Sequence, residues 1–238
     1  MSTNSKSILT VLKMAVTILF KPKELICLLR SKYYSRLVDQ GKGKIVISSP
    51  FLSVQIVKAK SAKIILDGNL IIDRHLFGNT KTIIYLKDHS NLHIGGKFSI
   101  GNGVTIFLGP NANLFIGGKK NESASGISKD TTIMVNKKIT IGTDFLCAWG
   151  VFISDSDWHT FNNMPHQKDI IIGDHVWIAN NTNILKGTKI GDGCVISSNS
   201  KLINKSYEKE LLVAGLEGKI IKNNITWSRD LQDLNTML

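Results

Sequence analysis

A short segment in the C-terminal half gathers side chains that could move a proton. Residues 154–160 read SDSDWHT, and His159 is the only histidine of the chain in such a constellation. A neutral imidazole titrates near physiological pH, so His159 is suited to general base catalysis. Asp155 or Asp157 could hold the other ring nitrogen, and the sequence does not choose between them. The alternative is that both aspartates are ordinary turn formers of a loop.

The remaining histidines and the cysteines give no second site. The histidines are His75, His89, His93, His166 and His175, and the three cysteines are Cys27, Cys147 and Cys194. His166 is the second candidate for a base, whereas His175 is expected at an outward turn on the surface. No ligand spacing of a metal site appears among them, so we expect no metal. Three widely spaced cysteines also give no disulfide framework, which favours a reducing cytoplasm.

The elements that must position His159 follow a six-residue repeat in residues 171–202. A large aliphatic residue recurs at every sixth place, and a smaller residue follows four places after each of the first five. The large residues are Ile172, Ile178, Ile184, Ile190, Ile196 and Leu202, and the small ones are Val176, Thr182, Thr188, Cys194 and Ser200. A helix or a simple strand would show other periods. A period of six indicates a triangular solenoid with the aliphatic side chains inside; the alternative is ordinary strands with accidental spacing.

The repeat is weaker but recognisable upstream, as in Ile94, Ile100 and Ile106. We therefore predict an all-β solenoid over residues 44–205, with about eight or nine coils of about 18 residues. Residues 154–169 interrupt the repeat as a long loop, and long loops on rigid scaffolds commonly carry function. Residues 206–238 are predicted to form a further strand pair and a short C-terminal helix.

Residues 1–43 differ from the rest of the chain in being rich in leucine and basic residues. We predict two helices here, over residues 7–20 and 23–39, divided at Pro22. Basic charge beside an apolar face fits an anionic membrane surface, and the same helices would equally serve as a cap on the open end of the solenoid. The apolar run at residues 8–20 is too short to cross a bilayer and lacks the cleavage site of a signal peptide.

The net charge narrows the choice of partners. The 238 residues include 30 Lys and Arg against 18 Asp and Glu, which gives a formal charge of +12. This excess implies an anionic partner, such as a phosphorylated cofactor, a membrane surface, an acidic glycan or nucleic acid, although generic surface lysine explains part of it. The few aromatic residues are not interleaved with the basic runs, so we do not expect nucleic-acid binding.

Three stretches resemble the hexapeptide-repeat acyltransferases. They are residues 176–180 (VWIAN), 190–193 (IGDG) and 214–222 (AGLEGKIIK). They are most similar to the branch that O-acetylates polysaccharides and lipopolysaccharides, and the similarity covers roughly residues 90–228. The resemblance implies a left-handed parallel β-helix, a homotrimer with active sites between subunits, and acetyl-CoA as donor. The sequence departs from the family pattern at Ala179, where glycine is usual, and at residues 216–218, where Asn-Pro-Ala is usual.

The resemblance also implies roles for individual residues. His159 would remove the proton of an acceptor hydroxyl as it attacks the thioester directly, without an acyl-enzyme. Residues expected along the donor are Trp177, Ala179, Asn180, Ser198, Lys205, Lys219 and Lys222. The lysines would meet the phosphates of CoA. The plainer alternatives are a solvated basic face for the lysines and packing between coils for the tryptophan.

We therefore expect a cytoplasmic O-acetyltransferase that modifies a cell-surface polysaccharide or its lipid-linked precursor. Its basic N-terminus would hold it peripherally at the inner face of the plasma membrane. One alternative is an acetyltransferase for a small acceptor, such as a free sugar, an antibiotic, serine or the amine of a nucleotide sugar. The other is a binding solenoid without activity.

Overall fold

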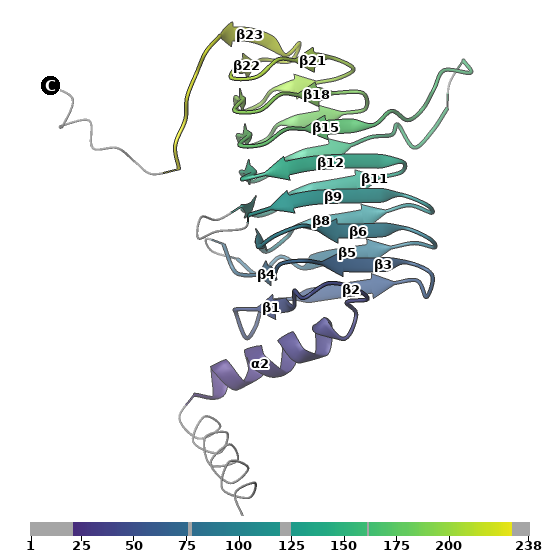
Figure 1. The fold of residues 1–238 in the computed structure, drawn as a ribbon, viewed down its shortest axis with the longest axis vertical. Helices are drawn as coiled ribbons and strands as arrows, with labels where there is room; N and C mark the ends of the chain where they lie inside the picture. Colours follow the sequence, from purple (N-terminus) through teal and green to yellow (C-terminus); the bar gives the residue numbers. More distant parts are fainter. Residues whose placement is uncertain (1–20, 76–77, 120–124, 161, 230–238) are drawn as a thin grey trace, which may run out of the picture.

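The computed structural model describes residues 21–75, 78–119, 125–160 and 162–229. Most of them form a parallel β-helix, in which successive strands belong to three different sheets and each sheet gains one strand per coil (Figure 1). Seven coils are complete, and an eighth begins with the last parallel strand of the first sheet. The predicted all-β solenoid is thus confirmed, and its first strand begins at Ile45.

The three sheets are named here by the order in which the chain enters them. The first contains β1 (Ile45–Ile47), β4 (Leu70–Ile72), β7 (Phe98–Ile100), β10 (Gly126–Ile127), β13 (Leu146–Cys147), β16 (Trp177–Ile178), β19 (Val195–Ile196), β22 (Leu212–Ala214) and β23 (Lys219–Lys222). The second contains β2 (Val54–Lys58), β5 (Thr82–Leu86), β8 (Thr105–Leu108), β11 (Thr132–Val135), β14 (Phe152–Ser154), β17 (Asn183–Leu185) and β20 (Lys201–Leu202). The third contains β3 (Lys63–Leu66), β6 (Asn91–Ile94), β9 (Asn113–Gly118), β12 (Lys138–Thr143), β15 (Ile170–Ile172), β18 (Lys189–Ile190) and β21 (Ser206–Tyr207).

The six-residue repeat accounts for the core. Aliphatic residues of the repeat that lie three hexapeptides apart are direct partners in neighbouring strands, for example Ile172 with Ile190 and Ile178 with Ile196. Their side chains are almost fully buried. The smaller repeat residues, such as Thr182 and Ser200, are buried as well. Each coil therefore buries its aliphatic residues against the coils above and below, which is the source of stability in a solenoid.

The sheets meet at three corners, which we call corner 1–2, corner 2–3 and corner 3–1 after the sheets they join. Several corners need a residue with positive φ. At corner 1–2 this place is held by Gly150 (φ +68°) and, in the next two coils, by Asn181 (φ +56°) and Asn199 (φ +58°). Asparagine is among the few residues other than glycine that tolerate this backbone conformation. The tight corners keep the coils in register, so residues at the same corner stack along the molecule.

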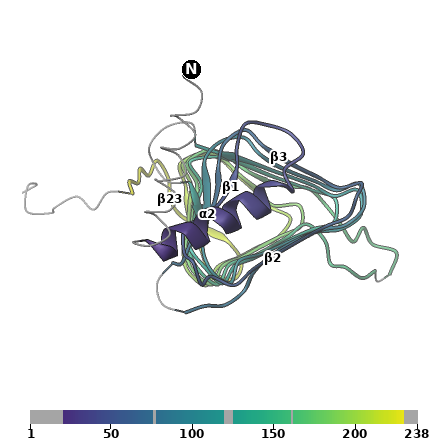
Figure 2. The same cartoon turned by 90° about the horizontal axis from the view of Figure 1, so that it is seen from below.

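Helix α2 (Pro22–Ser35) lies across the open end of the solenoid (Figure 2). It begins at Pro22, a favoured first residue of a helix, and ends before the predicted limit at residue 39. The Arg30 guanidinium donates to the carbonyls of Pro50 (2.7 Å) and Leu52 (2.6 Å), and Ser31 Oγ accepts the amide of Ile47 (2.8 Å). The helix thus satisfies backbone groups at the end of the solenoid. Among the described residues, no helix has the length and apolar character that a bilayer crossing requires.

The opposite end is closed by β22 and β23, which pair antiparallel. Residues 223–229 then run back along corner 3–1 without forming a helix (Figure 1). The predicted C-terminal helix falls mainly on residues 230–238, and the first predicted helix on residues 7–20. Both segments lie outside the described residues.

Candidate active site

The root of the loop at corner 2–3 is fixed by Asp155. This loop, residues 155–169, connects β14 with β15. The Asp155 carboxylate is fully buried and accepts three backbone N–H groups, from Asn136 (2.7 Å), Lys137 (2.8 Å) and Lys138 (2.7 Å). Burial raises the pKa of Asp155, whereas these three bonds act in the opposite direction. Asp155 therefore ties the loop to the coil before it.

The two legs of the loop pair with each other and stand off the body as a hairpin (Figure 1). The amide of Asp157 donates to the carbonyl of His166 (2.8 Å), and Ser156 Oγ is hydrogen-bonded to His166 Nδ1 (3.2 Å). Trp158 donates from Nε1 to Ser154 Oγ (3.1 Å). The base of the loop is therefore ordered by its own polar side chains.

His159 lies just beyond this ordered base. Its side chain is exposed, and none of the described residues is hydrogen-bonded to its ring. Asp157 forms an ion pair with Lys186, whose Nζ also donates to the carbonyl of Pro165 (2.9 Å). Within one chain, Asp155 is thus engaged by backbone amides and Asp157 by a lysine. The imidazole is left free to meet an acceptor or a second chain.

The residues expected along the donor form two groups. Trp177 on β16 is followed by Ala179 and Asn180 at corner 1–2, where Ser198 Oγ donates to Asn180 Oδ1 (2.7 Å). The second group lies at the C-terminal end of the solenoid. There Lys205 Nζ donates to the carbonyl of Glu217, and Lys219 lies 3.4 Å from the Glu217 carboxylate. Lys222 is exposed on β23.

The first group does not meet His159 within one chain, whereas Lys205 of the second group lies at corner 2–3 in a later coil. The loop leaves the second sheet at corner 2–3, while Trp177, Ala179, Asn180 and Ser198 lie at or beside corner 1–2. The full width of the second sheet separates the two corners. The chain's own geometry therefore leaves the predicted site in two halves.

A cluster at corner 3–1 has no counterpart in the sequence prediction. His175 Nδ1 is hydrogen-bonded to the Asp144 carboxylate (2.6 Å), and Nε2 is hydrogen-bonded to the carbonyl of Trp227 (3.1 Å). The Trp227 ring stacks on His175 at 4.0 Å and lies 5.8 Å from the ring of Trp177. His175, which we expected to be a simple surface residue, is therefore the anchor of the C-terminal segment.

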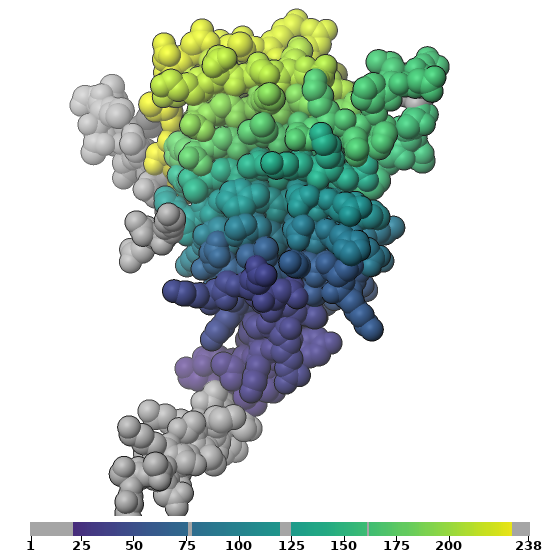
Figure 3. All heavy atoms as spheres, turned by 45° about the vertical axis from the view of Figure 1, so that its right-hand side comes forward, coloured from purple at the N-terminus to yellow at the C-terminus, as the bar shows by residue number. Residues whose placement is uncertain are grey.

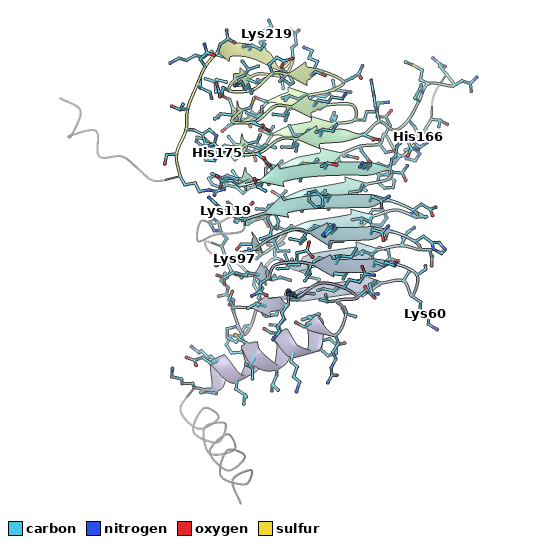
Figure 4. All side chains as sticks on the ribbon, in the orientation of Figure 1. Lys60, Lys97, Lys119, His166, His175 and Lys219 are labelled. Atoms are coloured by element: carbon cyan, nitrogen blue, oxygen red, sulfur yellow. The ribbon has the colours of Figure 1, made fainter. Side chains whose placement is uncertain are left out.

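The charge at Asp144 completes this cluster. Arg229 donates to its carboxylate (3.1 Å) and its carbonyl (3.2 Å), and Lys119 lies 3.5 Å away. Burial alone would raise the pKa of Asp144, but the His175 bond and the charges of Arg229 and Lys119 outweigh it and hold the pKa below its ordinary value. The carboxylate is thus stabilised in its charged form and fastens residues 227–229 to the solenoid. His175 and Lys119 lie along the same edge, opposite His166 (Figure 4).

The described residues form no metal site. Among the described residues, no group of three or more His, Cys, Asp or Glu side chains is placed to hold a metal ion. Two of the three cysteines are also unsuited to nucleophilic catalysis. Cys147 and Cys194 are fully buried, and burial raises the pKa of the Cys147 thiol to about 12. The titratable side chains of the loop are therefore the candidates for acid–base chemistry.

Comparison with known proteins gives the family. Residues 169–204 match the bacterial transferase hexapeptide family (six repeats). The polysialic acid O-acetyltransferase of Neisseria meningitidis is 30% identical over 176 residues, which cover 64% of this chain and 82% of that protein. The "Putative lipopolysaccharide biosynthesis O-acetyl transferase WbbJ" of Escherichia coli K12 is 26% identical over 171 residues, 65% of this chain and 84% of that protein. The crystal structure of the polySia-specific acetyltransferase NeuO aligns with 83% of this chain and 90% of its own, at 24% identity and a TM-score of 0.41. The match to the Neisseria protein, at 30% identity over four fifths of its length, shows that the chain belongs to the hexapeptide-repeat acetyltransferases.

Proposed function

We propose that this acetyltransferase moves an acetyl group from acetyl-CoA to a hydroxyl of a cell-surface polysaccharide or its lipid-linked precursor. The observation that carries this proposal is the extent of the match to proteins named as polysaccharide and lipopolysaccharide O-acetyltransferases, which spans more than four fifths of their length. A second support is the loop of residues 155–169, which presents His159 to solvent on a rigid scaffold.

His159 is the proposed general base. It accepts the proton of the acceptor hydroxyl as that oxygen attacks the thioester carbonyl, and it returns the proton to the departing thiolate as the carbon–sulfur bond breaks. Acetyl-CoA supplies the activated thioester when it is bound. An acyl-enzyme is not needed, and the buried thiols of Cys147 and Cys194 could not reach a substrate. Asp157 is the better candidate to support His159, because Asp155 already accepts three amides.

The residues proposed for the donor fit a long polyanionic molecule. Ala179 is a small, buried residue at corner 1–2, and Asn180 and Ser198 offer polar groups at the same corner. Lys219 and Lys222 are exposed on β23, and the Lys219 ammonium group is held only by a solvent-exposed ion pair to Glu217, so both lysines are accessible to phosphates. Because His159 lies at a different corner, we propose that a complete site forms between two copies in a homotrimer of left-handed β-helices.

Donor binding gives the first test, and it needs no acceptor. A ligand at about 100 times its dissociation constant stabilises a protein by about 2.7 kcal/mol, so excess acetyl-CoA should raise the melting temperature clearly. The double variant Lys219→Ala/Lys222→Ala should lose most of this shift. The control variant Lys42→Ala/Lys97→Ala removes the same charge at corner 3–1 and should keep it. If acetyl-CoA leaves the melting temperature of the unmodified chain unchanged at low and moderate salt, the donor assignment is wrong.

The outer side of α2 supports a second proposal, that the enzyme docks on the cytoplasmic face of an anionic membrane. Leu28 and Leu29 are 60% and 54% exposed, Tyr33 of the same helix is exposed as well, and Phe51 is exposed in the segment after β1. Basic residues flank this apolar surface: Lys23, Lys32 and Arg36. Exposed apolar side chains among basic ones are typical of helices that lie in a membrane interface. The free state of all three cysteines agrees with a reducing compartment.

Vesicle flotation tests this docking. The full chain should float with vesicles that contain phosphatidylglycerol and stay behind with pure phosphatidylcholine vesicles. The variant Leu28→Ser/Leu29→Ser should lose flotation, whereas Ile220→Ser/Ile221→Ser, at the opposite end of the solenoid, should keep it. Equal flotation of both variants would show that α2 serves only as the cap of the solenoid.

A further inference from the structure

We propose that a groove beneath the loop of residues 155–169 binds an acidic segment of the acceptor glycan. The groove has a volume of about 650 Å³ and is lined by Asn111, Asn113, Asn136, Lys137, Lys138 and Gln167, among others. It lies on corner 2–3, directly below the loop that carries His159 (Figure 3). This inference rests on the proposed function and names the kind of acceptor that the site would take.

The lining has the chemistry of a sugar site. Four of its side chains are carboxamides, which both donate and accept hydrogen bonds as sugar hydroxyls do. Asn136 donates to Gln167 Oε1 (2.7 Å), and Asn113 donates to the carbonyl of Asn111 (2.9 Å). Each of these amides keeps further donor or acceptor capacity for a ligand. Such a lining suits a polyhydroxylated molecule better than an apolar one.

The floor of the groove is rigid. The same Asp155 carboxylate that fixes the loop root accepts the amides of Asn136, Lys137 and Lys138, three consecutive lining residues. On the wall above, Gln167 pairs with Ser156 across the two legs of the loop. The groove and the loop are therefore held together by one set of bonds. A preformed site loses less conformational entropy when a flexible chain binds.

The lysine side chains of the groove favour an acidic ligand over a neutral one. Lys137 lies 2.7 Å from the Asp169 carboxylate, and its side chain is still 52% exposed. Lys138 is exposed, and none of the described residues is paired with its ammonium group. The Asp155 carboxylate below the groove is buried and covered by three backbone amides, so the charged side chains that reach the groove surface are two lysines and Asp169. This surface favours a sugar carboxylate.

Further lysines lie at corner 2–3 in the coils before and after the groove. Lysines at corner 2–3 in other coils are Lys60, Lys87, Lys168, Lys186 and Lys205. Lys186 is already paired with Asp157, and Asp88 lies at the same corner, so the surplus of positive charge comes from the remaining lysines. Lys60 and His166 lie along the same edge (Figure 4). Successive coils are about 4.8 Å apart, so a linear polyanion that runs parallel to the solenoid meets a lysine at short intervals. Many weak contacts of this kind add up for a polymer and not for a single sugar.

Binding of acidic and neutral oligosaccharides tests the proposal without any acetyl transfer. The probes are hexamers of galacturonate and of hyaluronate, with maltohexaose as the neutral control, titrated by calorimetry into the full chain at low salt. We expect at least one acidic hexamer to bind at least fivefold more tightly than maltohexaose, with an affinity that falls as salt rises. Equal affinity for maltohexaose, or no binding of any acidic hexamer, would overturn the proposal.

Three variants locate the binding. Lys137→Gln/Lys138→Gln should lower the affinity for the acidic hexamers by about five- to tenfold, since each exposed charge pair contributes up to about 1 kcal/mol. Lys42→Gln/Lys97→Gln removes equal charge at corner 3–1 and should change affinity less than twofold. Asp169→Asn should strengthen binding or leave it unchanged, because it releases Lys137. If the control weakens binding as much as the groove variant, the attraction is diffuse and the groove is not the site.

The donor experiment separates the two proposals. Stabilisation by acetyl-CoA should be the same in Lys137→Gln/Lys138→Gln as in the unmodified chain, because the groove is assigned to the acceptor alone. Failure of acetyl-CoA to stabilise the unmodified chain would contradict the proposed enzyme while leaving hexamer binding as an independent result. Normal stabilisation with no acidic binding would contradict only the acceptor groove.

Discussion

Replacing His159 by alanine should lower kcat by about 10²- to 10⁴-fold and leave the affinity for acetyl-CoA nearly unchanged. The imidazole is exposed at the end of an ordered loop base and is hydrogen-bonded to no described residue, so its loss should not disturb the fold. The effect should appear only in the step that removes the hydroxyl proton. Turnover with an identified acceptor, together with the acetyl-CoA melting shift, measures both quantities on one variant.

His166 provides the matched control for this experiment. It belongs to the same loop but is bonded through Nδ1 to Ser156 and lines the groove below. His166→Ala should therefore raise the apparent KM for the acceptor more than it lowers kcat. If the loss of kcat belongs to His166→Ala and His159→Ala turns over normally, the base has been assigned to the wrong histidine.

A mixing experiment extends the same prediction to the assembly. The two halves of the site lie at different corners of one chain, so a donor-side variant such as Asn180→Trp and the variant His159→Ala should each be inactive alone. If the chain forms the proposed homotrimer, mixed trimers of the two variants should recover part of the activity, because one interface can combine an intact loop with an intact donor side. No recovery after confirmed subunit exchange would show that each site is built within a single chain.

The solenoid could be predicted because its core obeys a local rule. Each inward residue contacts its equivalents in the coils above and below, so the same residue type is required at a fixed period along the chain. Ile172 pairs with Ile190, and Ile178 with Ile196, as a repeat of six residues on a three-sided coil demands. The long loop was visible for the same reason, since it breaks a period that resumes afterwards.

The tail cluster could not be predicted, because nothing local encodes it. Trp227 meets His175 across 52 residues of sequence, and Arg229 meets Asp144 across 85. These contacts depend on the path of residues 223–229 along corner 3–1, which a repeat does not describe. The only available signal was a tryptophan in an otherwise polar segment. A large aromatic residue in such a place commonly packs against something.

The acidic residues of the loop show a further limit. Sequence reasoning treated Asp155 and Asp157 as equal candidates to hold the imidazole, because both are near His159 along the chain. Their partners, however, lie in other coils: Asp155 accepts amides that are 17 to 19 residues earlier, and Asp157 pairs with Lys186, 29 residues later. Two aspartates two residues apart can thus be separated only when the neighbouring coils are known.

This difference gives the second large prediction: Asp155→Ala should lower the free energy of unfolding by about 3 kcal/mol or more. The substitution removes a buried carboxylate and leaves the amides of Asn136, Lys137 and Lys138 without an acceptor, at about 1 kcal/mol or more for each. It also releases the loop root, so activity should fall together with stability. Urea unfolding followed by circular dichroism measures the change.

Two milder variants decide what Asp155 does. Asp155→Asn keeps one oxygen that can accept amides and should therefore lose only part of the stability, with the pH dependence of the remaining activity unchanged. Asp157→Asn loses only a partly exposed ion pair to Lys186 and should change stability by less than about 1 kcal/mol. If Asp155→Asn instead keeps full stability while its activity falls and the pH profile shifts, Asp155 acts through the imidazole of His159. The hydrogen bonds observed here favour the first outcome, because both carboxylate oxygens already accept backbone amides.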